Sequence, residues 1–485
     1  MMYLARRKKV WRSNQTTVAG ALFAGIVSLL PVSAHAQCGE LTWLEAINQA
    51  LDANQALVAA RQTLDAQHKD IAIARATMLP GVGFGGLAQL SKDSTFSSSA
   101  GVVPERTLQV AGKITQTLYN QGDIDALGSQ KHLHLSQQES FEDTRNQTIA
   151  AAGQDYLGVL LAEALVALQQ DNLGLSKQSL DLTKAQESSG QVPYRNVLRW
   201  QTQLYAAERQ LVAQEGSLLA SRFRFNQVRN RPGEEICKLE ELTVDENGFI
   251  FASEAIAKEI SDDAKAALAR DYLVALGLER SVVLRSLDAE IKAEQRKMKS
   301  ARRWLIPSLD AAAAAASFVK TGGAGSDEQQ DGEIFWQVGL TLDWSVLDGG
   351  AYIATMNQSK AEFWSLRSQR TNAATSLEEN IRSTAAAAMA SFEQIGLAEK
   401  EAQASEENYK LVNEAYLQGE AALIEQIDAQ QQLIQANTAA RQALYQFLSD
   451  VVSLEQSIAY YPFLEGDAGS RVHELEAKLQ GARLE

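Results

Sequence analysis

The feature that most constrains the fold is a tandem repeat that covers most of the chain. Pro80 recurs as Pro307 at an offset of 227 residues, and Gly190 recurs as Gly419 at an offset of 229. Between these pairs the segment LYNQG recurs as VLDGG at an offset of 228. An offset that changes by only two residues indicates a tandem duplication of one fold. We expect the following division: a signal peptide at 1–36, a first repeat at 37–230, a linker at 231–260, a second repeat at 261–465 and a polar tail at 466–485.

Each repeat has the same order of elements. A helix comes first and ends at Pro80 or Pro307, and the Thr42-x-x-Glu45 capping box marks the first helix start. Two strands follow each proline. The clearest strand is Ile334 to Val346, where apolar residues alternate with Phe, Gln, Gly, Thr, Asp and Ser. Its counterpart, 108–118, alternates more weakly, and the segments at 82–92 and 310–317 are predicted strands by repeat position.

Long helices follow the second strand of each repeat. The first runs from Gly122 to Gly190, which at ~1.5 Å per residue is a rod of roughly 100 Å. Its leucines fall at seven-residue spacing and predict a coiled-coil seam: Leu161, Leu168, Leu175 and Leu182. Gly190 and Gly419 then break helix-forming sequence, and Pro193 suits a first helical turn. Each repeat is therefore expected to end in a helical hairpin with its tip at one of these glycines.

The first residues predict export. A basic segment precedes the apolar run Val18 to Leu30, and Ala34-His35-Ala36 offers a cleavage site before Gln37. No later segment reaches the ~18 apolar residues expected of a spanning helix. Cleavage after Ala36 would leave 40 basic and 60 acidic residues, a net charge of −20, which excludes nucleic acid as an expected partner.

The chain has two cysteines, Cys38 and Cys237. In an exported protein such a pair favours a disulfide over a metal site. Lipidation of Cys38 is the alternative, although Gln37 stands where a lipoprotein signal takes Gly, Ala or Ser.

Sites for cofactors, metals and catalysis are not expected. His132 and His134 are two residues apart and do not share a helix face, and His35, His68 and His473 are scattered. No phosphate loop and no nucleophile elbow occurs, so the chain is not expected to be an enzyme.

The chain resembles the TolC-type outer-membrane efflux proteins over its whole mature length. The resemblance is carried by the signal peptide, the two repeats, the proline before each strand pair, the LYNQG and VLDGG turns, and YLQGEAALIEQIDAQQQL. It implies a mixed α+β membrane protein and a homotrimer. Each chain would give four strands to a shared twelve-stranded barrel in the outer membrane, and the helices would form a periplasmic coiled-coil tunnel closed at the hairpin tips. Four strands cannot close a barrel alone, so membrane strands require oligomerisation.

The resemblance also implies a gate at the second tip. Glu425 and Asp428 match acidic residues that narrow the tunnel entrance in the family, and at i, i+3 they share one helix face. The alternative is an ordinary solvated face. Tyr416 matches a tyrosine that holds the closed state, but its expected acidic partner is Asn196 here.

A different latch is therefore a hypothesis: Arg195 or Arg199 would pair with Glu425, Asp428 or Glu420 of a neighbouring hairpin. Arginines that face solvent are the competing interpretation. The resemblance further places the N-terminus and the linker at mid-tunnel level, where Cys38 and Cys237 would be close. Trp336 and Trp344 are candidates for an interfacial aromatic belt or for simple packing.

The resemblance predicts a passive exit duct that receives substrates from an inner-membrane pump of RND or ABC type through a periplasmic adaptor (membrane fusion) protein. Small-molecule efflux and type I secretion of proteins both remain open. The rival interpretation is a soluble periplasmic coiled-coil scaffold or adaptor. That alternative does not explain the apolar alternation from Ile334 to Val346, which in a soluble protein would leave an exposed, aggregation-prone strand edge.

Overall fold

The computed structural model describes residues 38–90, 106–242, 263–303, 305–322 and 331–465. Contacts divide the chain into Met1–Gln37 and Cys38–Glu485, and the description concerns the second unit. The predicted signal peptide and the polar tail lie outside the described residues.

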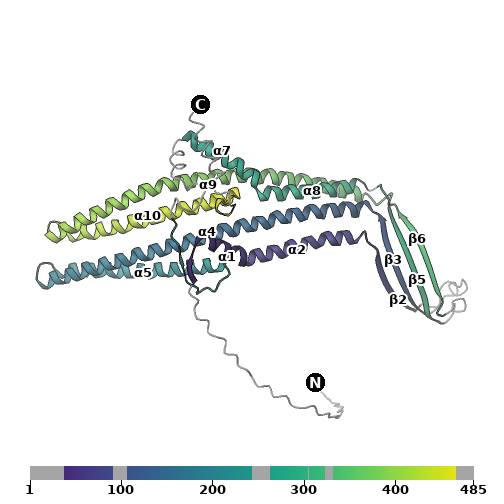
Figure 1. The fold of residues 1–485 in the computed structure, drawn as a ribbon, viewed down its shortest axis with the longest axis horizontal. Coiled ribbons are helices and arrows are strands. Elements are labelled where there is room, and N and C mark those ends of the chain that lie inside the picture. The colour runs from purple at the N-terminus through teal and green to yellow at the C-terminus, as the bar shows by residue number, and fades with distance from the viewer. Residues whose placement is uncertain (1–37, 91–105, 243–262, 304, 323–330, 466–485) are drawn as a thin grey trace, which may run out of the picture. The chain divides into compact units, whose positions relative to one another are not determined.

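The elements of the two repeats follow one another in matching order (Figure 1). In the first repeat they are β1 (Cys38–Leu41), α1 (Trp43–Ala53), α2 (Gln55–Ala76), β2 (Gly81–Leu90), β3 (Arg106–Tyr119), α4 (Gln121–Ser188) and α5 (Tyr194–Val228). After β4 (Cys237–Leu239), they are α7 (Asp263–Arg280), α8 (Val282–Arg302), β5 (Ser308–Gly322), β6 (Ile334–Asp343), α9 (Ala351–Gln418), α10 (Leu423–Ile458) and α11 (Pro462–Glu465).

The first helix of each repeat is broken in two, which corrects the prediction of one helix up to the proline. Asn54 ends α1 and caps α2, its side-chain oxygen accepting from the Ala56 and Leu57 amides. Ser281 caps α8 in the same way. The two breaks are 227 residues apart, so they belong to the repeat. Asn and Ser favour N-cap positions because their side chains satisfy free amides, and this signal was overlooked.

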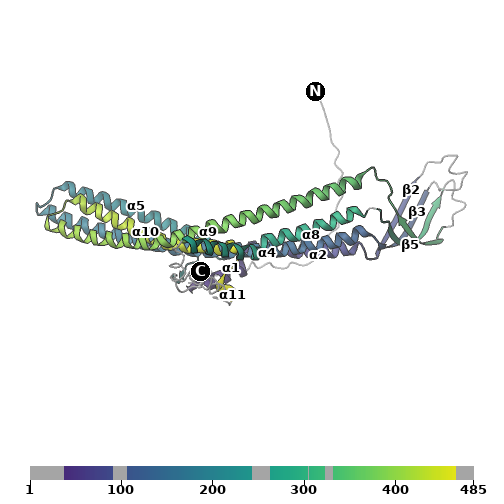
Figure 2. The same cartoon turned by 90° about the horizontal axis from the view of Figure 1, so that it is seen from above.

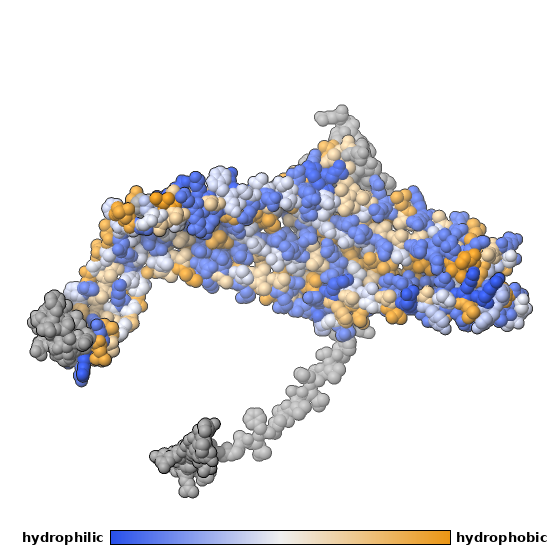
Figure 3. Space-filling view, turned by 180° about the vertical axis from the view of Figure 1, so that it is seen from behind, coloured by the Kyte–Doolittle hydropathy of each residue, from blue (hydrophilic) through white to orange (hydrophobic). Residues whose placement is uncertain are grey.

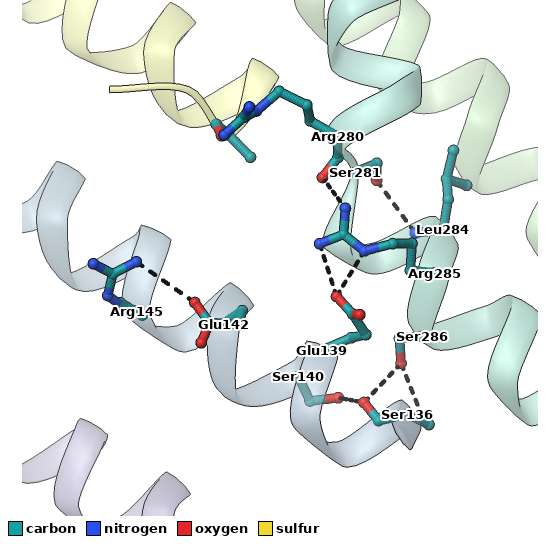
Figure 4. A network of polar contacts seen from close by, with 11 residues as sticks. Ser136, Glu139, Ser140, Glu142, Arg145, Arg280, Ser281, Leu284, Arg285 and Ser286 are labelled. Carbon is teal, nitrogen blue, oxygen red and sulfur yellow. Dashed lines mark hydrogen bonds and ion pairs between the residues drawn. The ribbon is translucent and has the colours of Figure 1, made fainter. Parts of the chain in front are cut away.

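The break before α8 is held by polar contacts to α4 (Figure 4). Arg285 bonds to the carboxylate of Glu139 on α4 with its Nε at 2.9 Å, and its Nη1 donates to the carbonyl of Arg280 at 2.8 Å. Further along the same seam the hydroxyls of Ser136 and Ser286 lie 2.9 Å apart. Because hydrogen-bonded polar pairs have directional geometry, these contacts fix how α8 lies along α4.

The helices α4 and α9 each have 68 residues, a length of roughly 100 Å. The helix α4 packs against α5, α8, α2 and α10, and α9 packs against α10 (Figures 1 and 2). One 18-residue window of α4 has a mean hydropathy of 1.4, enough to cross a membrane by length and composition. Because 56% of that window is buried in the protein, we interpret α4 as a core helix.

The leucines predicted as a seam on α4 are not the positions that α4 buries most deeply within this chain. Leu182 is 38% exposed, and the other three leucines of the series are only partly buried. The buried positions form a heptad series beside it that consists largely of small and polar residues: Ala162, Val166, Gln169, Ser176, Leu180 and Thr183. Small and polar side chains at these positions let neighbouring helices approach closely and hydrogen-bond, so leucine spacing alone does not locate them.

Four strands form one antiparallel sheet in the order β2-β3-β5-β6. The predicted strand at 310–317 lies within β5, even though it is a run of alanines, and β2 forms the part of the predicted strand at 82–92 that the structure describes, which ends at Leu90. The strand β6 ends at Asp343, so Trp344 and Val346 lie beyond it rather than within it as predicted. Both edge strands, β2 and β6, are unpaired on their outer sides among the described residues.

Strand register separates the two faces of the sheet. One cross-sheet row joins Val82, Ile114, Ala313 and Val338, all apolar. The next row, on the opposite face, joins Gly83, Lys113, Ala314 and Gln337. Val82 and Val338 are 64% and 71% exposed, and hydrophobic residues lie over the strands in Figure 3. The sheet thus has one apolar face and one mixed polar face.

The main core lies where the two repeats meet. It gathers Trp43 and Ile47 of α1, Tyr156 of α4, and Val451 and Ile458 of α10, all at most 4% exposed. Here α1, α4, α7, α9 and α10 meet around the short parallel pair β1 and β4. Two distant parts of the chain, the start of the first repeat and the linker, are joined by that pair.

Candidate functional site

The hairpin tips are built by glycines in left-handed conformation. The helix α4 ends at Ser188, and Gly190 with φ 77° turns the chain before α5 begins at Tyr194. The helix α9 ends at Gln418, and Gly419 with φ 82° caps it. Positive φ is strained for residues with a Cβ, so glycine suits both turns.

An apolar cluster joins the two hairpins just behind the tips. Trp200 of α5, which is 1% exposed, packs with Tyr416 of α9 and Ile427 of α10. The remaining members of the cluster are Leu180, Val197 and Leu423. Tyr416 thus lies between the hairpins, while its hydroxyl has no hydrogen-bond partner among the described residues. The cluster fastens α5 to the second hairpin by burial of large aromatic side chains.

Amides continue this contact away from the tips. The side chain of Gln430 on α10 donates to Asn172 Oδ1 at 3.0 Å and to Ser176 Oγ at 3.1 Å, both on α4. Gln426 donates to Asn413 Oδ1 of α9 at 2.7 Å. Gln426 and Gln430 are buried, so the hydrogen bonds offset part of their desolvation. The hairpin interface is therefore apolar at Trp200 and polar beyond it.

The carboxylates of Glu425 and Asp428 lie on the other side of α10. Both are exposed, whereas Gln426, Ile427 and Gln430 between and after them are buried. Asp428 accepts a hydrogen bond from Gln432 Nε2 at 2.9 Å, one turn further along the helix. Packing of the buried residues thus fixes the direction in which the two carboxylates point, away from the hairpin interface.

The arginines of the first tip are exposed. Arg195 and Arg199 lie at the start of α5, and Asn196 between them is partly buried. Across the described residues, no ion pair within 4.0 Å joins either arginine to Glu420, Glu425 or Asp428 of the same chain. The structure therefore brings the candidate latch residues to the same end of the hairpins without pairing them within one chain.

Sequence reasoning missed Trp200 and Gln430 as contacts between hairpins. The spacing of Val197, Trp200 and Leu204 follows one helix face and could have indicated a buried stripe. Nothing local indicates that this stripe meets Tyr416, more than two hundred residues later.

Comparison with known proteins settles the family. The sequence matches the outer membrane efflux protein family over residues 46–228 and 273–459, most of both repeats. The chain belongs to the outer membrane efflux protein family. Members of this family are outer-membrane transport proteins rather than enzymes, so the outer membrane is the location of this protein, with its helices in the periplasm. A soluble periplasmic scaffold is not favoured.

Solved structures agree in fold. The outer-membrane channel OprN is 17% identical with a TM-score of 0.69, covering 86% of this chain and 90% of that one. VceC from Vibrio cholerae is 14% identical with a TM-score of 0.70, covering 86% and 96%. The CmeC outer-membrane channel from Campylobacter jejuni is 14% identical with a TM-score of 0.71, covering 89% of each chain. No curated protein matches the sequence.

Proposed function

We propose that this efflux protein works as a homotrimeric duct, with the four-stranded sheets of three chains closing into one twelve-stranded barrel. The observation that carries the proposal is the sheet itself, which has one exposed apolar face and two open edges, β2 and β6. Unpaired backbone groups cannot remain in lipid, and closure with neighbouring copies pairs them. The mixed face with Lys113 and Gln337 would then line the lumen.

The tips of the hairpins form the entrance in this proposal. Threefold symmetry would bring Glu425 and Asp428 of each chain around one axis, where their negative charge attracts cations and disfavours anions. Their exposure and their direction away from the hairpin interface support this role. The tunnel does no chemistry, and energy comes from a partner pump.

The expected partners are a periplasmic adaptor protein and an inner-membrane pump of RND or ABC type. A hollow of about 520 Å³ between α4, α5 and α10, further along the helices than the tips, supports adaptor docking, because beside apolar side chains it offers hydrogen-bonding amides such as Gln203, Gln210 and Gln431. Small-molecule efflux is proposed before type I secretion, since the family is one of efflux proteins.

Recording from the purified protein in a planar lipid bilayer tests the proposed duct. Discrete conductance steps from membrane-inserted trimers are the expected result. Trimers that insert and carry no current, even after the tips are loosened by substitution, would contradict it.

The latch hypothesis predicts that Arg199→Ala raises conductance. Exposed ion pairs contribute only ~0–1 kcal/mol each, but a trimer repeats the contact three times. Single-channel conductance and antibiotic leakage in cells are the measurements, and Arg209→Ala, further from the tip on α5, is the control. Unchanged conductance in Arg199→Ala and in Arg195→Ala would leave these side chains as solvated residues of the first tip.

We further propose that Cys38 and Cys237 form a disulfide. Their backbones are direct neighbours in the parallel pair of β1 and β4, and no cysteine is free among the described residues. The bond would staple the chain start to the linker at the core. Thiol labelling of denatured, non-reduced protein should find no free thiol, and mass spectrometry of the reduced protein should find Cys38 without a lipid. A lipid on Cys38 together with a labelled Cys237 would contradict the disulfide.

A further inference from the structure

Two histidines that are distant in the sequence lie against each other in the half of the helices next to the sheet. The ring centroids of His68 on α2 and His134 on α4 are 5.2 Å apart, with their planes at 59°. His132, two residues earlier on α4, instead lies near Arg296 and Lys292 of α8. The sequence analysis counted His68 among the scattered histidines, whereas in the structure it lies against His134 from another helix.

His68 is exposed, whereas Nδ1 of His134 is buried and has no hydrogen-bond partner among the described residues. Nε2 of His134 lies 3.2 Å from the Gln138 amide nitrogen, a contact that a stronger ligand can displace.

The spacing fits two imidazoles on one ion. Metal–nitrogen bonds of ~2.0–2.1 Å place two imidazole nitrogens on the same ion ~3 Å apart. When two rings have centroids 5.2 Å apart and each turns one nitrogen toward the other, the two nitrogens come within ~3 Å of each other. His68 is exposed and on the surface of its helix, so it can rotate without disturbing a core.

We propose that His68 and His134 form a binding site for one first-row transition-metal ion, with water completing its coordination. Imidazole suits Cu²⁺, Ni²⁺ and Zn²⁺, and Cu²⁺ binds tightest among them. The site has a structural consequence. The helix α2 buries only Leu57 among its 22 residues, and one residue before His68 the Gln67 amide donates to Gln130 Oε1 of α4 at 3.0 Å. A bridging ion adds a strong cross-link to this weakly packed helix.

The test is a Cu²⁺ titration of the full-length protein in detergent at neutral pH. A His473→Gln background leaves His68, His132 and His134 as the histidines of the mature chain. Calorimetry should show one ion per chain, and electron paramagnetic resonance should show nitrogen ligation. His68→Gln and His134→Gln should each weaken binding about tenfold or more, because each removes one of two protein ligands. The control variant His132→Gln should bind Cu²⁺ with the same affinity as the His473→Gln background.

Hydrogen exchange gives a second readout that does not depend on affinity alone. With Cu²⁺ present, amides of α2 around His68 should exchange more slowly, and this protection should vanish in His68→Gln. Circular dichroism confirms that each variant is folded. Absence of binding, or equal binding by the His68→Gln and His134→Gln variants and their background, would overturn the proposal.

Discussion

Val338→Arg is expected to abolish assembly of this protein in the outer membrane. Val338 lies mid-strand in β6, is 71% exposed and belongs to the apolar cross-sheet row with Val82 and Ile114. On the lipid face of a barrel an arginine at mid-depth costs ~2–4 kcal/mol, and a trimer carries the substitution three times. Membrane fractionation and native sizing should find no inserted trimer.

Gln337→Arg is the matched control, because it introduces the same charge one residue away on the opposite face. Its cross-sheet row already contains Lys113, which indicates a watery environment. If the Gln337→Arg variant inserts normally and the Val338→Arg variant does not, the face with Val338 meets lipid and the face with Gln337 meets water. Equal tolerance of both arginines would mean that the apolar face does not meet lipid.

Trp200→Ala is expected to loosen the entrance. The side chain is 1% exposed and packs against Tyr416 and Ile427 of the second hairpin. Truncation of a buried tryptophan to alanine typically lowers the free energy of unfolding by ~3–5 kcal/mol, because buried apolar surface is lost and a cavity is left. Because the cluster joins two hairpins, hydrogen exchange at the start of α10 should accelerate, and the mean channel conductance should rise.

Trp364→Ala provides the comparison for that experiment. Trp364 is on α9 and 53% exposed, so its loss should change stability by no more than about 0.5 kcal/mol. Exchange at the α10 start that stays slow in Trp200→Ala would show that the cluster does not fasten the hairpins.

The periodic and repeated parts of this chain were predictable from sequence. Repeat position identified β5, although its run of six alanines favours a helix by propensity. The helix α4 was predicted at nearly its observed length because few residues within it interrupt a helix. Gly190 and Gly419 stand at turns where positive φ leaves little choice of residue.

What sequence could not supply are contacts between distant segments. The Trp200–Tyr416 packing, the Gln430 bonds to α4 and the meeting of His68 with His134 each join separate helices. Helix periodicity shows which residues share a face but not which face they meet. The leucine spacing of α4 is a further example, since within this chain the neighbouring helices pack on the adjacent small and polar positions.

The ion selectivity of single channels in a planar bilayer tests the account most directly. Reversal potentials under a KCl gradient should show a preference for cations in the wild type. Glu425→Gln with Asp428→Asn should greatly reduce that preference, because it removes the carboxylates and keeps their size. Glu40→Gln with Asp52→Asn, an exposed Glu and Asp pair in β1 and α1, should leave it unchanged. Selectivity that is the same in all three proteins would contradict a carboxylate-lined entrance at the second hairpin tip.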